Sequence, residues 1–107
     1  MIKVLFVMHK RPDMDEAAFR DYWRNTHGPL TAKLPGLRSY VQHHPFPDPH
    51  GDPLPADGID VLEFDGVFAM QDALATPEGQ AMLDDIGNFL DKDRSGPVII
   101  EEENRLV

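Results

Sequence analysis

The sequence predicts an α+β protein whose strands and helices follow the order β-α-β-β-α-β. A nearly unbroken apolar run over residues 2–8 is typical of a strand that is covered on both faces. A helical spacing of aromatic side chains follows, then two further strand patterns, a second helical region and a β-branched run at residues 98–100. Right-handed connections between such short strands favour a split βαβ sheet, the ferredoxin-like arrangement, with both helices on one face.

Length and composition set the class of protein. At 107 residues the chain is predicted to form one domain, spanning residues 1–107, that is large enough to bury a core. The absence of cysteine excludes disulfides, thiolate nucleophiles and cysteine-based metal sites. No apolar run approaches the roughly 20 residues of a membrane span, and the first residues lack a signal-peptide pattern. We therefore expect a cytoplasmic protein with no membrane partner.

The charge is unevenly distributed along the chain. The net charge is −9, with +3 in residues 1–44 and −12 in the remainder. An acidic protein repels phosphate backbones, so we expect no nucleic-acid partner. A small anionic substrate near the more basic first half stays an open alternative.

The first helix has a predicted start and a predicted interruption. Asp13 and Glu16 have the spacing of a capping box. Gly28-Pro29 predicts a break or kink near His27, because proline removes a helical hydrogen bond and clashes with the preceding turn. Between these points, one helix face is expected to carry Phe19, Tyr22, Trp23, Thr26 and Leu30.

The remaining elements follow from turn signals and periodicity. Residues 37–46 and 59–64 are predicted strands, and the five prolines within 45–58 predict a loop or a mobile flap between them. Residues 67–75 are predicted to be helical. Thr76 then restarts a helix as its N-cap, with proline in the first helical position.

The two faces of the first strand make different predictions. One face is purely apolar and is expected to pack on the helices: Ile2, Val4, Phe6 and Met8. The other alternates with it and ends in polar residues: Lys3, Leu5, Val7 and His9. Two helices cover only one sheet face, so we expect a second copy of the chain to cover the other and form a homodimer with a closed barrel.

A set of residues after the first strand resembles a known family. The pattern Phe19-x-x-Tyr22-Trp23-x-x-x-His27-x-Pro29-Leu30, followed by Leu34-Pro35-Gly36-Leu37-x-x-Tyr40-Val41, is similar to the EthD domain of the dimeric α+β barrel superfamily. The resemblance implies a homodimer with a cavity between the sheet and the helices of each protomer. Characterised members include cofactor-free isomerases of muconolactone type and fungal enzymes that dehydrate or decarboxylate aromatic polyketides. In the methylmuconolactone isomerases a histidine after the first helix and a tyrosine on the second strand are implicated, and these motif positions correspond to His27 and Tyr40.

Both motif positions have a catalytic and a structural interpretation. His27 is either a general acid/base that titrates near neutrality or a cation at a helix C-terminus. Tyr40 either donates a hydrogen bond to a developing oxyanion or fills the core. The resemblance favours the catalytic interpretation of His27 and makes a catalytic Tyr40 as plausible as a structural one.

Three other residues are predicted to bind the substrate. Trp23 and Phe19 are expected as core or pocket wall, and Trp23 also has the ring for stacking on an aromatic ligand. His44 shares a strand face with Tyr40 and Gln42, so it is the better pocket candidate of the adjacent histidines 43 and 44.

Metal and nucleotide chemistry lack sequence support. No His-x-His or H-E-x-x-H spacing is present, so no metal site is predicted. The sequence also has no phosphate loop, nucleophile elbow or dinucleotide fingerprint, so no cofactor is predicted. Glu63 and Asp65 share a face of the third strand, where solvent or basic residues of a partner are expected to meet them.

The leading functional hypothesis is a small cofactor-independent enzyme that acts on a hydrophobic, oxygen-bearing organic molecule, such as an aromatic, polyketide-like or lactone compound. His27 would move a proton and Tyr40 would stabilise the oxyanion, as in an isomerase or lyase. Two alternatives stay open. One is a haem-binding or oxygen-using, monooxygenase-like relative, and the other is a non-catalytic module that binds a small ligand.

Overall fold

A computed structural model describes all residues from 1 to 107. Four strands form one antiparallel sheet in the order β2-β3-β1-β4. The strands are β1 (Ile2–Met8), β2 (Ser39–His43), β3 (Gly58–Phe64) and β4 (Gly96–Ile100). The helical elements are α1 (Glu16–Tyr22), η1 (Trp23–His27), α2 (Gly28–Thr31), α3 (Val67–Leu74), α4 (Pro77–Asp85) and η2 (Ile86–Asn88).

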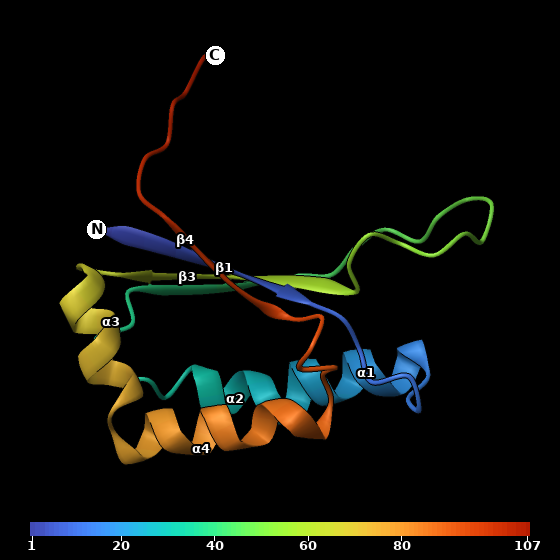
Figure 1. Cartoon of the computed structure of the whole chain (residues 1–107), viewed down its shortest axis with the longest axis horizontal. Helices are drawn as coiled ribbons and strands as arrows, with labels where there is room; N and C mark the ends of the chain where they lie inside the picture. Colours follow the sequence, from blue (N-terminus) through green and yellow to red (C-terminus); the bar gives the residue numbers. More distant parts are fainter.

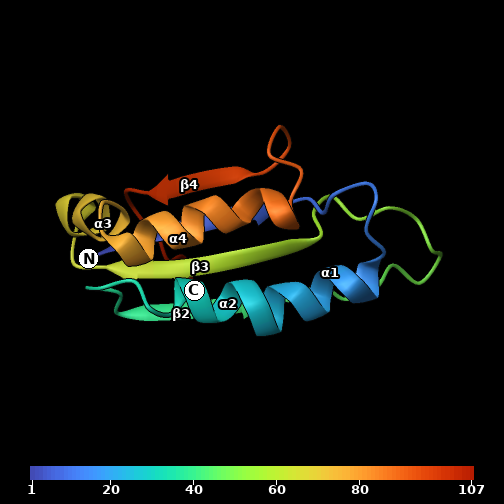
Figure 2. The same cartoon turned by 90° about the horizontal axis from the view of Figure 1, so that it is seen from below.

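The helices form one layer on one side of the sheet. The α1–α2 segment and α4 lie side by side beneath the strands, and α3 descends from the sheet to α4 at one end (Figures 1 and 2). The central strands β1 and β3 pair along their full length, from Ile2 opposite Phe64 to Met8 opposite Gly58. The predicted ferredoxin-like α+β fold is confirmed. None of the helices has the length and apolar character that a membrane crossing needs.

The predicted break or kink near His27 takes the form of a local distortion and not a chain break, because regular α-helix ends at Tyr22 while the helical path continues to Thr31. Residues 23–27 form a π-helical turn, and Gly28 keeps helical angles of φ −52° and ψ −49° while its N–H bonds the carbonyl oxygen of Trp23. This wider turn accommodates Pro29 without ending the helix. The turn also changes which side chains face inward. Thr26 is exposed rather than part of the inner face. Apart from Gly28, the buried residues come at intervals of four: Phe19, Trp23, His27 and Thr31.

The start of the first helix also differs from the prediction. Asp15 is the N-cap, since its carboxylate accepts a 2.7 Å hydrogen bond from the backbone N–H of Ala18. Asp13 instead pairs with the Arg11 guanidinium at 2.7 Å, so it does not form the capping box. The prediction for α4 is confirmed, because the Thr76 hydroxyl accepts a 3.1 Å bond from the Gly79 N–H.

The core lies between the sheet and the helix layer in two clusters. One surrounds Phe64 and Met82, and the other surrounds Trp23, Phe19 and Phe89, whose side chains are completely buried. The apolar face of β1 packs inward as predicted, with Val4 and Met8 buried. The strand pattern therefore places the core correctly.

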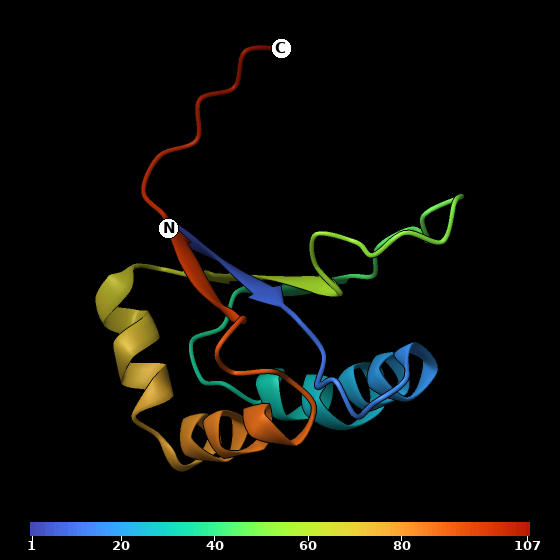
Figure 3. The ribbon, with the colours of Figure 1, turned by 45° about the vertical axis from the view of Figure 1, so that its right-hand side comes forward.

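The sheet face opposite the helices has no covering element in this chain. Figure 3 shows it open, with the C-terminal residues leaving on that side and the segment between β2 and β3 extending past the end of the sheet. That segment contains no helix or strand, as its prolines predicted. Apolar side chains on the open face are partly exposed, among them Val41 at 45% and Val98 at 52%. The face is therefore apolar but uncovered.

Candidate functional site

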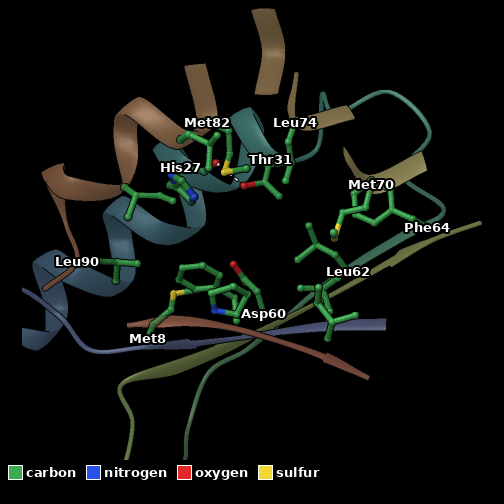
Figure 4. Close-up of a pocket in the computed structure, with 16 residues that line it drawn as sticks. Met8, His27, Thr31, Asp60, Leu62, Phe64, Met70, Leu74, Met82 and Leu90 are labelled. Carbon is green, nitrogen blue, oxygen red and sulfur yellow. Dashed lines mark hydrogen bonds between the residues drawn. The ribbon is translucent and has the colours of Figure 1, made fainter. Parts of the chain in front are cut away.

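A cavity of about 170 Å³ lies between the sheet and the helix layer. Of the 16 residues that line it, 12 are hydrophobic, contributed by β1, β3, β4, α3, α4 and the residues after α4. Three polar residues share this lining: His27, Thr31 and Asp60. Figure 4 shows His27 and Thr31 on the helix side of the cavity and Asp60 on the sheet side. The polar side chains therefore face a mostly apolar space.

His27 occupies the last position of the π-helical turn, which directs it inward. Its exposed fraction is 4%, and its ring packs on Phe89 with centroids 4.5 Å apart. The Nδ1 atom lies 2.9 Å from Oδ2 of Asp85, the last residue of α4. No protein group bonds Nε2, the nitrogen that is left to interact with a molecule in the cavity. The fold thus joins two helices at one imidazole–carboxylate pair.

Asp85 is held by further hydrogen bonds that keep it ionised. Its Oδ1 accepts from the Tyr22 hydroxyl at 2.5 Å and from the Asn88 amide at 2.9 Å. Burial raises the pKa of Asp85, but the hydrogen bonds from Tyr22, Asn88 and His27 outweigh it and hold that pKa below its usual value. An ionised Asp85 accepts the Nδ1–H of His27, so the lone pair of the imidazole lies on Nε2.

The His27 imidazole is neutral near pH 7. Burial lowers its pKa, and the attraction to Asp85 offsets that effect only in part. The contact between the two residues is therefore a hydrogen bond from a neutral ring rather than an ion pair, although the distance alone satisfies an ion-pair criterion. A neutral imidazole with a free Nε2 is a competent proton acceptor.

Asp60 is a buried acid on β3 that the sequence analysis missed. It is 4% exposed, and the Trp23 indole donates a 3.0 Å hydrogen bond to its Oδ1. Burial raises the pKa of Asp60 to about 7, although hydrogen bonds from Trp23 and Tyr40 act in the opposite direction. At neutral pH the protonated and ionised forms of Asp60 are therefore both populated. Figure 4 shows its carboxyl group pointing from the sheet into the cavity.

Tyr40 lies beside Asp60 but does not line the cavity. Its hydroxyl accepts a 2.9 Å bond from the Gln42 amide, which also bonds the carbonyl oxygen of Trp23 at 3.0 Å. Burial, followed by the negative charge of Asp60, raises the pKa of Tyr40 above its ordinary value. Tyr40 thus stays protonated, and its hydroxyl is a neighbour of the Asp60 carboxyl group.

The three predicted substrate-binding residues lie behind the cavity wall. Phe19 and Trp23 are completely buried in the core, with ring centroids 5.8 Å apart. His44 stacks on the Trp23 ring at 4.0 Å and contacts the Gln42 side chain through Nε2 at 3.0 Å. None of the three lines the cavity, although Trp23 is connected to it through Asp60.

The two acids that the sequence analysis did not identify, Asp60 and Asp85, differ in how far the sequence could have revealed them. Asp60 alternates with Leu62 and Phe64, so strand parity alone places a carboxyl group on the buried face. Asp85 follows another acid in an amphipathic helix, where nothing distinguishes it from a solvated residue. No three His, Asp or Glu side chains converge in a group that could hold a metal ion.

Comparison with known proteins identifies the family. The model of the EthD domain matches residues 11–93, which is most of the chain. An EthD (ethyl tert-butyl ether D) family protein from Bacillus halodurans shares 30% identity with a TM-score of 0.79, covering 96% of this chain and all of the other. The chain therefore belongs to the EthD family, as its motif predicted.

Other solved structures show the same fold at low identity. A dimeric ferredoxin-like protein of unknown function from Thermobifida fusca has a TM-score of 0.69 at 18% identity, covering 92% of this chain and 88% of its own. SnoaB, a cofactor-independent oxygenase from Streptomyces nogalater, has a TM-score of 0.61 at 14% identity, covering 98% and 93%. None of the curated proteins compared with the sequence matches it.

Proposed function

We propose that this protein is a small cofactor-independent enzyme that moves a proton on a hydrophobic, oxygen-bearing molecule. The observation that carries this proposal is the His27–Asp85 pair at the cavity. A neutral imidazole, oriented by an ionised carboxylate and open on Nε2, has the geometry of a general base. The surrounding wall is mostly apolar, and an apolar environment strengthens electrostatic interactions within the site.

The proposed reaction is a proton shift that requires no external oxidant or reductant. Nε2 of His27 takes a proton from a carbon next to a carbonyl group, and the C–H electron pair moves into the substrate as an enolate. Asp85 stabilises the resulting imidazolium. Protonated Asp60 donates a hydrogen bond to the enolate oxygen. Where a C=C bond is conjugated with the enolate, His27 returns its proton to the far carbon of that bond. The double bond then shifts, the carbonyl group re-forms and the base is neutral again, which completes an isomerisation. Without such a bond the proton returns to the same carbon, and the step is proton exchange alone.

Asp60 takes the oxyanion role in this proposal because it lines the cavity and Tyr40 does not. Tyr40 acts through Asp60, as a positioning residue beside that carboxyl group. Trp23 holds Oδ1 of Asp60 through its indole N–H. The motif residues thus contribute both the base and the support for the acid.

We also propose that a second copy of the chain covers the open sheet face. Its partly exposed apolar residues include Val41 and Val98, and the fold is shared with ferredoxin-like proteins described as dimeric. Val41→Asp is expected to shift the protein from dimer to monomer in light scattering coupled to size exclusion. Val67→Asp is the matched control, since Val67 is 41% exposed but lies on α3. A monomeric wild-type protein would contradict the dimer.

The haem alternative does not fit the cavity. A space of about 170 Å³ is close to the roughly 150 Å³ that an engineered cavity needs for one benzene ring, and haem has four pyrrole rings. The oxygen-using alternative is supported by fold similarity alone. The non-catalytic alternative would be supported if the protein binds a compound in the following test without exchanging its protons.

The test is proton exchange in deuterated water. Purified protein is incubated with a panel of cyclic ketones and lactones, and NMR follows deuterium incorporation next to the carbonyl carbon. We expect catalysed exchange on at least one compound, with loss of about 10²-fold or more in His27→Gln. Asp84→Asn is the matched surface control, because Asp84 is exposed and contacts only Gln80 among side chains. Catalysed exchange that survives His27→Gln would overturn the mechanism, and binding without exchange would leave a ligand-binding module.

A further inference from the structure

The cavity also restricts which molecules the proposed enzyme accepts. We infer that its substrate is an uncharged molecule with a single ring and a carbonyl-type oxygen at one end. This inference rests on the proposed function for its chemistry, but its size and charge arguments concern binding alone. Three features of the cavity carry it: its volume, the absence of cations from its wall, and the clustering of its polar groups.

The volume limits the ligand to one ring. A cavity of about 170 Å³ is only slightly larger than the roughly 150 Å³ cavity that binds benzene in an engineered protein. At the packing density of a protein interior, one benzene ring does not fill such a cavity, so a short substituent such as an acetyl group also fits. Two or more fused rings would have to displace core side chains, which costs about 1–3 kcal/mol or more in a packed interior.

The charge of the lining excludes carboxylate ligands. The only titratable groups in the lining are His27 and Asp60, and no Lys or Arg is among the lining residues. A carboxylate in this space would lose its hydration without gaining a permanent cation. It would also lie near Asp60, which is itself acidic. The open alternative of a small anionic substrate is therefore disfavoured, and so is a lactone that bears a carboxylate group.

The polar groups are placed so that a ligand binds in one orientation. Met70, Phe64 and Leu62 form an apolar end of the cavity, away from His27 (Figure 4). Asp60 and His27 offer a hydrogen-bond donor and a proton acceptor toward the rest of the space. A ring against the apolar end with its oxygen toward Asp60 satisfies both regions, because the apolar surface is buried and the oxygen is bonded.

The test is a set of binding measurements with three probes. Acetophenone is a neutral one-ring ketone, benzoate is its charged counterpart, and 2-acetylanthracene carries the same acetyl group on three fused rings. Trp23 is the only tryptophan, and it bonds Asp60 in the cavity wall, so its fluorescence reports occupancy. Calorimetry on the same protein gives Kd independently. We expect acetophenone to bind at least tenfold more tightly than either other probe.

Two variants connect the selectivity to the cavity. Met70→Ala enlarges the apolar end and is expected to narrow the preference for acetophenone over 2-acetylanthracene by at least threefold. Gln71→Ala is the matched control, since Gln71 is the exposed neighbour on α3. Asp60→Asn removes the acid and is expected to narrow the preference for acetophenone over benzoate. Thermal melts of each variant establish that it is folded before its binding is compared.

The outcomes separate this inference from the proposed function. Equal binding of benzoate, equal binding of 2-acetylanthracene, or no binding of acetophenone would each overturn the inferred ligand class. Selective binding of acetophenone that produces no proton exchange would support the ligand class and contradict the catalytic role of His27. Proton exchange on a charged or multi-ring compound would support the catalytic role of His27 and contradict the inferred ligand class.

Discussion

The Nδ1 atom of His27 lies 2.9 Å from a carboxylate oxygen of Asp85, a residue 58 positions later in the chain. This contact joins the end of a π-helical turn to the end of α4. π-Helical turns are rare and occur frequently at functional sites, because they re-aim one side chain within a helix. Here the turn buries His27 at the cavity, and Asp85 fixes its tautomer. The pair leaves Nε2 of His27 available to a molecule in the cavity.

Replacing Asp85 tests the orientation of that imidazole. Asp85→Asn keeps the shape of the side chain but removes the charge that stabilises a protonated His27. We expect kcat for proton exchange to fall by about 10²–10⁴ while the protein stays folded. The measurement is the exchange rate by NMR on any compound that the wild type turns over. An Asp85→Asn rate equal to that of Asp84→Asn would show that the carboxylate does not act in the reaction.

The raised pKa of Asp60 predicts a pH-dependent stability. The folded state prefers neutral Asp60, whereas the unfolded chain ionises it near pH 3.8. The stability that Asp60 contributes is therefore fully present below about pH 4 and is lost as the pH rises to about 7. The interval from 3.8 to about 7 spans about three pH units at 1.36 kcal/mol each, so the loss approaches roughly 4 kcal/mol.

Asp60→Asn isolates that effect, because asparagine keeps an oxygen for Trp23 but does not ionise. We expect the variant to gain stability relative to the wild type as the pH rises from 4 to 8. Urea unfolding followed by circular dichroism at several pH values measures this difference. The lowered pKa of His27 makes the folded state less stable at acid pH. Both proteins contain His27, so this effect cancels in the difference between their free energies of unfolding. A difference in unfolding free energy that stays constant across the range would contradict a raised pKa.

The Trp23 ring packs so closely on Gly58 that position 58 has no room for a side chain. A Cβ atom at Gly58 would lie 2.6 Å from the indole ring, whereas one at Gly96 would meet nothing within 4 Å. Gly58→Ala is therefore expected to lower the free energy of unfolding by about 1–3 kcal/mol. Chemical denaturation of both variants gives the comparison. A Gly58→Ala protein as stable as Gly96→Ala would mean that the Trp23 ring is free to move away.

The fold was predictable from strand parity and turn signals. The apolar face of β1, the N-cap at Thr76 and the proline-rich loop all follow from local chemistry that a single sequence displays. The π-helical turn was not predictable in the same way, because a Gly-Pro pair is ordinarily a helix break. The π-helical turn requires glycine at position 28, because a Cβ atom there would lie 2.6 Å from the amide nitrogen of Gln42. That nitrogen donates a hydrogen bond to the carbonyl oxygen of Trp23.

The candidate site was predictable only in part. His27 was identified through its motif, and the structure places it in the cavity wall. Tyr40 was identified in the same way, yet it lies behind Asp60, since a sequence motif specifies neighbours but not which of them reaches a cavity. Asp60 alternates with buried apolar residues on β3, so strand parity alone could have placed it on the inner face. Asp85 left none, because its importance arises from a contact between two helices that are distant in the sequence.

The state of the His27 ring tests the central claim most directly. ¹⁵N NMR on histidine-labelled protein distinguishes the two tautomers and the imidazolium, and His27→Gln assigns the His27 signals among the five histidines. We predict a neutral ring at pH 7, protonated on Nδ1 and unprotonated on Nε2, with a pKa below 6.5. A charged ring at pH 7, or a neutral ring with its proton on Nε2, would contradict a base that is directed into the cavity.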